Sequence, residues 1–256
     1  MQFCLWGNKC DLSVSGGAIL DGQHTGTASQ LDHLKPWILV DHISEVWELL
    51  QSIDRGSDHE VHIDFVLDNS GFEVFTDLCL AEFLLSLNLA KTIHFHVKNI
   101  PWFVSDASAK DILWQLGQMQ KSNDDHISKL GARWQTRFKE GSFKFKEHMY
   151  WTLAHDYSEM KMTSPDLYTD LSKAKLIFFK GDLNYRKLVG DRKWPHTTPF
   201  SEALWGFCPA PLCSLRTLKA DVVVGLKPGQ DSEAETKDEK WMVNGTYAVI
   251  QYQHNL

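Results

Sequence analysis

The first half of the chain alternates short apolar runs with one long stretch of helical periodicity. Residues 62–67 (HIDFVL) combine apolar side chains with β-branched Ile63 and Val66, a composition typical of a buried strand. Residues 72–88 place apolar side chains near helical spacing and predict a helix, and residues 92–97 (TIHFHV) predict a second strand. A strand, a helix and a strand at this spacing form a βαβ unit with parallel strands. The pattern therefore predicts an α/β fold with an open, mostly parallel sheet flanked by helices.

Three more apolar segments extend the predicted sheet. Residues 174–179 (AKLIFF), 220–226 (ADVVVGL) and 245–252 (GTYAVIQY) each predict a strand. Residues 15–30 and 227–240 predict exposed loops, because the first is rich in Gly, Ser and Thr and the second carries Pro, Gly and dense charge. Neither loop separates two halves with their own cores, so residues 1–256 are interpreted as a single domain.

The composition narrows the class of protein. The 33 acidic and 26 basic residues give a formal net charge of −7, which argues against a dedicated nucleic-acid binder. No apolar run approaches the roughly 18 residues of a spanning helix, and the first residues lack the layout of a signal peptide. The five cysteines include no C-x-x-C pair and are interpreted as reduced thiols. We therefore expect an intracellular protein, cytoplasmic or also nuclear, with no direct nucleic-acid partner and no membrane partner.

Polar clusters follow three of the predicted strands. They are Asp68 with Asn69, then Asp106, then Asp182 with Asn184. Ligands of open α/β sheets bind at the carboxyl ends of the strands, so these side chains are expected to converge, although Asp and Asn are also ordinary turn residues. Carboxylate and amide oxygens suit Mg²⁺ or Mn²⁺, which can also take a phosphate oxygen.

Basic residues near the third cluster add to this chemistry. Arg186 and Lys187 follow Asp182 on what is predicted to be a loop, and Arg186 could hold a phosphate with paired donors. Metal, cation and carboxylate together indicate phosphoryl chemistry on a small molecule. The sequence lacks the Asp-x-Asp of haloacid-dehalogenase-type phosphatases, a G-x-G-x-x-G turn, a P-loop and a G-x-S-x-G elbow.

Two other patterns have simpler interpretations. His94 and His96 alternate on the second predicted strand and face one side, as two metal ligands would, but burial or surface placement explains them equally well. Residues 133–146 (RWQTRFKEGSFKFK) interleave basic and aromatic side chains. Within an acidic chain they are interpreted as a solvated amphipathic surface and not as a nucleic-acid interface.

An ordered set of motifs resembles the metal-dependent damage-control phosphatases. The four main motifs are residues 68–73 (DNSGFE), 101–106 (PWFVSD), 180–188 (KGDLNYRKL) and 216–219 (RTLK). A further motif, residues 6–13 (WGNKCDLS), extends the resemblance over nearly the whole chain. The most similar subgroup is the one described as sugar phosphate phosphatase and acidic residue methyltransferase, and the resemblance implies a Rossmann-like three-layer arrangement.

The resemblance implies a phosphomonoesterase that uses a divalent metal such as Mn²⁺, Co²⁺, Ni²⁺ or Mg²⁺. Its expected substrates are sugar phosphates such as fructose 1-phosphate and fructose 6-phosphate, in a damage-control role. By motif position, Asp68, Asn69 and Asp106 match the metal ligands, and Asp68 and Asp106 are the expected catalytic residues. The matching substrate-binding positions are Asp68, Asn69, Asp106, Asp182, Leu183, Asn184, Tyr185, Arg186 and Lys219. Either a metal-polarised water or Asp68 would attack phosphorus.

The same resemblance carries two alternatives. Glu73 matches a position assigned to S-adenosylmethionine, which implies a protein-glutamate carboxyl methyltransferase with the replication clamp as a partner and a link to the DNA damage response. Members of the subgroup also carry a long helical region before the motif that starts here at Trp6. The chain is therefore expected to be a shortened form that lacks this layer, and an inactive binding module is the third hypothesis.

Overall fold

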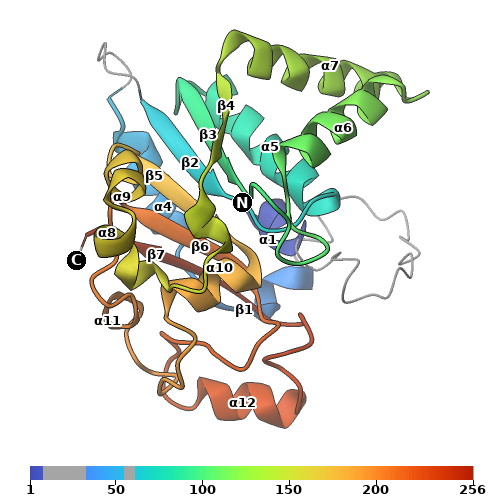
Figure 1. The fold of residues 1–256 in the computed structure, drawn as a ribbon. Coiled ribbons are helices and arrows are strands. Elements are labelled where there is room, and N and C mark those ends of the chain that lie inside the picture. The colour runs from blue at the N-terminus through green and yellow to red at the C-terminus, as the bar shows by residue number, and fades with distance from the viewer. Residues whose placement is uncertain (8–32, 55–60, 256) are drawn as a thin grey trace.

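The computed structural model describes residues 1–7, 33–54 and 61–255. Within these residues, seven strands form one sheet in the order β1-β7-β6-β5-β2-β3-β4 (Figure 1). Neighbouring strands are parallel, except that β6 and β7 are antiparallel. The predicted α/β fold with a mostly parallel sheet is confirmed. The strands are β1 (Ile38–Asp41), β2 (His62–Val66), β3 (Thr92–Val97), β4 (Phe143–Glu147), β5 (Leu176–Lys180), β6 (Leu212–Thr217) and β7 (Ala248–Gln253).

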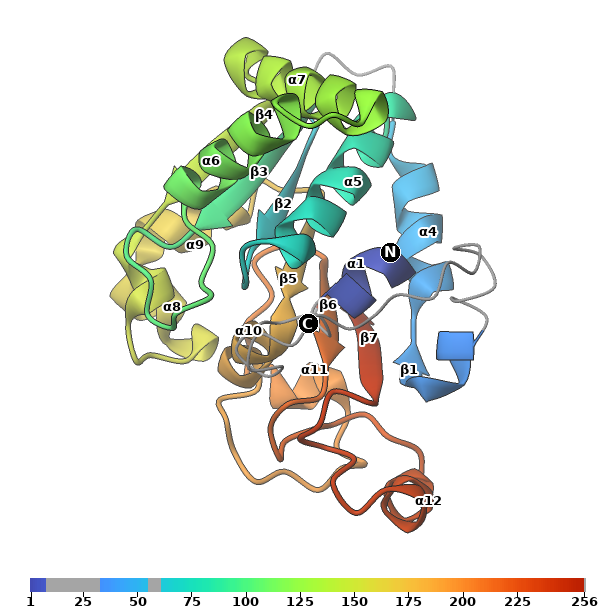
Figure 2. The same cartoon turned by 90° about the vertical axis from the view of Figure 1, so that its right-hand side faces the viewer.

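Helices cover both faces of the sheet and complete a three-layer arrangement (Figure 2). The first face packs against α1 (Gln2–Gly7), α4 (Ile43–Ser52), α5 (Phe72–Ser86), α6 (Ala109–Gln120) and α7 (Asp125–Glu140). The second face packs against α8 (Met160–Thr163), α9 (Pro165–Leu171), α10 (Gly181–Leu188) and α11 (Phe200–Ala203). The remaining helices are α12 (Gln230–Lys237) and the short 3₁₀ turns η2 (Lys35–Trp37), η3 (Met149–Thr152) and η4 (Tyr157–Glu159).

Strand β5 shows why the apolar runs are continuous. Leu176 and Phe178 belong to the hydrophobic core on the first face, whereas Ile177 and Phe179 belong to the core on the second face. All four side chains are fully buried. A strand covered by helices on both faces needs apolar residues at every position, which is the pattern that a parallel sheet requires.

Helix α7 has clear sequence signals at both ends. The side chain of Asp124 accepts hydrogen bonds from the backbone amides of His126 and Ile127, and thereby caps the first turn. Gly141 ends the helix in the left-handed conformation with φ +82°. Asp124 thus fixes where α7 begins, and Gly141 fixes where the chain turns from α7 into the edge strand β4.

Most predicted elements near the centre of the sheet are confirmed. The predicted strands at residues 62–67, 92–97, 174–179 and 245–252 correspond to β2, β3, β5 and β7, and the predicted helix at residues 72–88 is α5. The strand predicted at residues 220–226 is wrong, because this segment has no strand partner. Its backbone is bonded by side chains instead: the Tyr185 hydroxyl accepts from the Val224 amide, and Arg216 and Gln251 donate to its carbonyls.

Two other expectations need correction, and two fall outside the described residues. Residues 227–240 contain the helix α12 and are not wholly a loop, since Ala, Glu, Gln and Lys favour a helix there. Residues 133–146, which are predicted to be a solvated amphipathic surface, span the end of α7 and most of β4. The segment is not wholly solvated, because Trp134 is fully buried. Residues 8–13 and the predicted loop at residues 15–30 lie outside the described residues. Among those that are described, no helix has both the length and the apolar character needed to cross a bilayer.

Candidate active site

The predicted site residues lie at the carboxyl edge of the central strands. After β2 the chain builds β3 and β4 on one side and then returns to place β5 on the other side of β2. Asp68 follows β2 and Asp182 follows β5, so the two residues flank the point at which the strand order reverses. This reversal is where open α/β sheets bind their ligands.

A pocket of about 280 Å³ lies at this edge. Seven of the predicted site residues line it: Asp68, Asn69, Asp106, Asp182, Leu183, Arg186 and Lys219. The other lining residues are Phe103, Val104 and Ser105, which belong to the segment just before Asp106. The volume is just below the range of about 300–1,000 Å³ for drug-sized ligand sites, so the pocket suits a small metabolite.

Two carboxylates of the pocket converge on one cation. The Lys98 ammonium donates to Asp106 Oδ1 at 2.5 Å and lies 3.5 Å from Asp68 Oδ1. The backbone amides of Trp102 and Phe103 donate to Asp106 Oδ2, each at 2.7 Å. These contacts hold the Asp106 carboxylate in one orientation. Lys98 follows β3 directly, and the sequence patterns gave no indication that it would join the site.

Asn69 is held between the two acidic segments. Its side-chain oxygen accepts from the Ser105 hydroxyl at 2.6 Å, and its amide donates to Glu73 Oε2 at 2.9 Å and to Asp68 Oδ2 at 3.2 Å. A single antiparallel bridge also joins the backbones of Asn69 and Asp106. The predicted trio of Asp68, Asn69 and Asp106 therefore lies together, although the last two are separated by more than 30 residues of chain.

Burial has a large effect on the protonation of Asp68. Its removal from water raises the pKa to about 7, and the nearby carboxylates of Glu73, Asp106 and Asp182 act in the same direction, while Lys98 opposes them. A buried carboxylate beside other carboxylates is stabilised by positive charge. The site therefore favours a bound cation.

The start of α10 approaches this carboxylate closely at Gly181. The residue has φ +78°, and a Cβ atom built there would overlap Oδ2 of Asp68 and lie 2.6 Å from its Cγ. Only glycine satisfies both the backbone conformation and the contact. The absence of a Cβ at Gly181 thus leaves room for the Asp68 carboxylate between the end of β2 and the start of α10.

Gly181→Ala is expected to lower the free energy of unfolding by about 2 kcal/mol or more, because positive φ and a core clash both act against it. Urea unfolding measures the change. Gly229→Ala is the matched control, since Gly229 has φ +82° and no atom within 4 Å of its built Cβ. A loss at Gly181 no greater than that at Gly229 would show that the contact with Asp68 carries no cost.

Asp182 anchors the opposite wall of the pocket. Its Oδ1 accepts from Arg216 Nε at 2.7 Å and from the Lys219 backbone amide at 3.0 Å. Arg216 is fully buried, and its guanidinium also lies 4.2 Å from the ring centre of Tyr185. This pairing fixes the segment that carries Lys219. Arg216 belongs to a motif found in the sequence, but its contact with Asp182 depends on the tertiary fold.

The predicted loop after β5 is in fact α10, which begins directly at Gly181. Arg186 lies on this helix, is partly exposed at the pocket, and bonds Asp191 through both Nε and Nη2. Asn184 and Tyr185 are buried and do not line the pocket. The Asn184 amide donates to the carbonyls of Val66, Leu67 and Lys180, so it ties α10 to the end of β2.

Glu73 lies behind the pocket and not in it. The side chain is 2% exposed, and its carboxylate accepts from Asn69 and lies 3.3 Å from the Lys180 ammonium. Lys180 also contacts Asp77 Oδ1 at 2.9 Å and the carbonyl of Cys4 at 3.1 Å. These contacts connect the pocket to α1. The role of Glu73 in binding S-adenosylmethionine stays a prediction.

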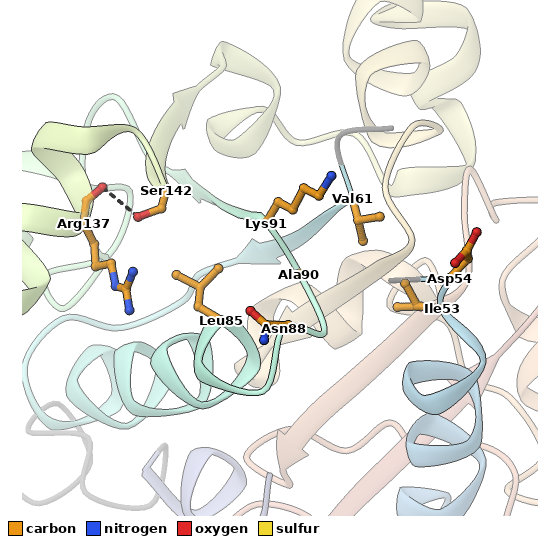
Figure 3. A pocket seen from close by; sticks show the side chains of 9 residues that line it. All are labelled: Ile53, Asp54, Val61, Leu85, Asn88, Ala90, Lys91, Arg137 and Ser142. Atoms are coloured by element: carbon orange, nitrogen blue, oxygen red, sulfur yellow. Dashed lines mark hydrogen bonds between the residues drawn. The ribbon is translucent and has the colours of Figure 1, made fainter. Parts of the chain in front are cut away.

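A separate pocket of about 450 Å³ opens at the amino ends of β2, β3 and β4 (Figure 3). Its walls include Val61, Lys91 and Arg137. The Arg137 guanidinium is already paired with Glu82, at 3.0 and 3.2 Å. This edge is opposite to the one at which open α/β sheets bind ligands. We therefore take the pocket around Asp68 as the candidate active site.

The donor set of the candidate active site fits a hard divalent cation. Asp68, Asn69 and Asp106 present carboxylate and amide oxygens, which Mg²⁺ and Mn²⁺ prefer. The two carboxylates already face a common positive charge, that of Lys98. Arg186 and Lys219 line the same pocket and supply the positive charge that an anionic group needs. The geometry defines an α/β protein with an acidic, cation-holding pocket at the switch point of its sheet.

Comparison with known proteins identifies the family. Residues 1–234 match the family model described as the damage-control phosphatase ARMT1-like domain. The chain therefore belongs to this family, and the resemblance inferred from the motifs is confirmed.

Three relatives share the name damage-control phosphatase ARMT1. The protein of Bos taurus is 50% identical over 254 residues, that of Homo sapiens 49% over 256 residues, and that of Xenopus tropicalis 48% over 254 residues. Each match covers 98% of this chain. It covers 57% of the bovine and human proteins and 58% of the frog protein. The chain thus spans little more than half the length of these curated relatives.

Proposed function

We propose that the chain is a metal-dependent phosphatase of small phosphorylated metabolites. The observation that carries the proposal is the convergence of Asp68 and Asp106 on one cation, Lys98, at the switch point of the sheet. Membership of the damage-control phosphatase family supports the same activity. Sugar phosphates such as fructose 1-phosphate and fructose 6-phosphate are the substrates we propose, because the pocket is small and is lined by acidic and basic side chains.

Each wall of the pocket has a separate task in this reaction. Asp68, Asn69 and Asp106 would hold a divalent metal, which neutralises phosphate charge and polarises a bound water. Arg186 and Lys219 would bind phosphate oxygens from the side of α10 and β6. Arg216 acts through Asp182 and keeps the backbone of Lys219 in place. Lys98 holds the Asp106 carboxylate.

Hydrolysis in the presence of metal and of chelator tests this function. We expect turnover of an aryl phosphate and of fructose 1-phosphate with Mn²⁺, loss of turnover with excess EDTA, and recovery when Mn²⁺ is restored. Phosphate release measures all three. Equal turnover with and without chelator would refute a metal-dependent reaction, and no turnover of any phosphomonoester with Mn²⁺, Co²⁺, Ni²⁺ or Mg²⁺ would refute the phosphatase itself.

A further inference from the structure

A group of polar side chains lies on the second face of the sheet, away from the pocket. His62 and Asp64 alternate on β2, and His94 and His96 alternate on β3, where Asp64 is paired with His94. All four side chains are buried, and Asp64 is 1% exposed. The opposite face of the same two strands carries only apolar residues between them. Buried polar groups of this kind require partners.

We propose that His62, Asp64 and His94 form a second metal site that takes a divalent transition metal of the zinc type. The site is separate from the candidate active site, since Asp64 precedes Asp68 by four residues, or up to about 13 Å of extended chain. Neither the family match nor the proposed phosphatase activity requires it.

The distances between donor atoms fit this kind of metal. His94 Nδ1 lies 3.2 Å and His62 Nε2 lies 3.8 Å from Asp64 Oδ1, and the three donor atoms lie within 4.8 Å of one another. Ligands about 2.0–2.1 Å from a tetrahedral metal are about 3.4 Å apart. Two imidazoles and one carboxylate form a donor set that zinc proteins use, with water in the fourth position. The all-oxygen set of Asp68, Asn69 and Asp106 suits a harder ion.

Asp64 supplies an anionic ligand that lacks a full set of hydrogen bonds. Its Oδ1 is buried and accepts no hydrogen bond of good geometry from the described residues. The other oxygen, Oδ2, lies 3.0 Å from His96 Nε2, which orients the carboxylate from behind. A metal cation at Oδ1 would give this buried oxygen the partner that it lacks.

The neighbourhood also allows an ion to enter and a water to bind. The side chains of His62 and His94 are each about 10% exposed, so the site reaches the surface on one side. The hydroxyl of Thr92, which is paired with His62 across the strands, is buried and has no hydrogen-bond partner among the described residues. It can bond a water on the metal. The two imidazole rings are stacked at 4.4 Å and 29°, so binding turns them about their Cβ–Cγ bonds.

Cobalt spectroscopy on the full chain tests the proposal. Four-coordinate Co²⁺ absorbs strongly in the visible region, whereas Co²⁺ in a six-coordinate oxygen site absorbs weakly. We expect one equivalent of strongly absorbing Co²⁺, displaced by Zn²⁺, both in the wild-type chain and in Asp68→Asn. Weak bands alone, or loss of the strong bands in Asp68→Asn with the fold intact by circular dichroism, would overturn the second site.

Variants assign the bound ion to its ligands. His62→Asn and His94→Asn are each expected to weaken binding of the strongly absorbing Co²⁺ by about 10-fold or more and to reduce the rise in Tm that Zn²⁺ gives the parent. His155→Asn is the control, since His155 is exposed and paired with Glu159 at 2.8 Å. Should His94→Asn fail to fold, His62→Asn at the first position of β2 decides the test. Unchanged binding in His62→Asn would overturn the assignment.

Failure of the second metal site can be distinguished from failure of the proposed phosphatase activity. The second site predicts metal binding in a chain whose candidate active site is disabled, and its readouts are a spectrum and a Tm. Loss of phosphatase turnover in Asp68→Asn leaves both readouts in place. A chain that hydrolyses phosphate but gives no four-coordinate Co²⁺ spectrum supports the proposed function and refutes the second site.

Discussion

Asp106→Asn is expected to lower metal-dependent phosphatase turnover by about 100-fold or more, since a change to a partner of a metal ligand already costs about 10–100-fold. The substitution keeps the size of the side chain but removes its charge. It also places an amide where the carboxylate accepts from Lys98 and from the backbone amides of Trp102 and Phe103. The measurement is kcat/KM for an aryl phosphate with saturating Mn²⁺.

Two comparisons keep this result interpretable. Asp125→Asn removes an exposed carboxylate that pairs with Lys129 on the surface of α7, and it should leave kcat/KM unchanged. The melting curve of Asp106→Asn, followed by circular dichroism, separates loss of the site from loss of the fold. If folded Asp106→Asn retains turnover within a few-fold of the parent, Asp106 is not part of the catalytic site.

Lys180→Met is expected to reduce the free energy of unfolding by about 3–5 kcal/mol, the cost of removing one partner of a buried ion pair. The Lys180 ammonium is fully buried between the carboxylates of Asp77 and Glu73. Burial alone would lower its pKa, but the charge of Asp77 raises the pKa well above the usual value. The stabilisation is therefore complete at neutral pH and is lost only as the pH rises through that elevated pKa.

The loss of unfolding free energy in Lys180→Met should be larger at high pH than at low pH. Burial already raises the pKa of Asp77 to about 6, and removal of Lys180 raises it further because the lysine charge opposes that shift. A folded-state pKa above the unfolded value means that the folded chain binds more protons, so stability falls as the pH rises. Urea unfolding of Lys180→Met should accordingly show a smaller deficit at pH 5 than at pH 8.

A surface lysine provides the reference for this measurement. Lys129→Met breaks the exposed pair with Asp125 and should change stability little at either pH. An equal deficit of Lys180→Met at pH 5 and pH 8 would show that the buried carboxylates do not take up protons in its place.

The fold could be predicted where the strands are buried on both faces. Strands β2, β3 and β5 have continuous apolar runs, and α5 has a clear helical period. The apolar pattern does not predict strand β6, because its sequence, LCSLRT, includes Ser214 and Arg216, two polar residues that are fully buried in the structure. The segment at residues 220–226 has strong β propensity but lies against side chains, so tertiary contacts overrode the local preference.

The candidate site was predictable only in outline. The acids after β2, β3 and β5 could be placed together because parallel strands bring their carboxyl ends to one edge. The cations that hold these acids could not be identified from periodicity, because the pairs join residues far apart in the chain. Arg216 is 34 residues from Asp182 in the chain. The local sequence around a buried lysine such as Lys98 does not distinguish it from a lysine on the surface.

The edge strand β4 has a consequence for self-association. An open sheet ends in strands with unpaired backbone groups, which can add a strand from another molecule. Strand β4 alternates Phe143 and Phe145, which face the core, with Lys144 and Lys146, and then ends in Glu147. A neighbouring chain that docked here would have to bring its own strand beside these charges. The lysines of β4 thus act as gatekeepers against aggregation through the sheet edge.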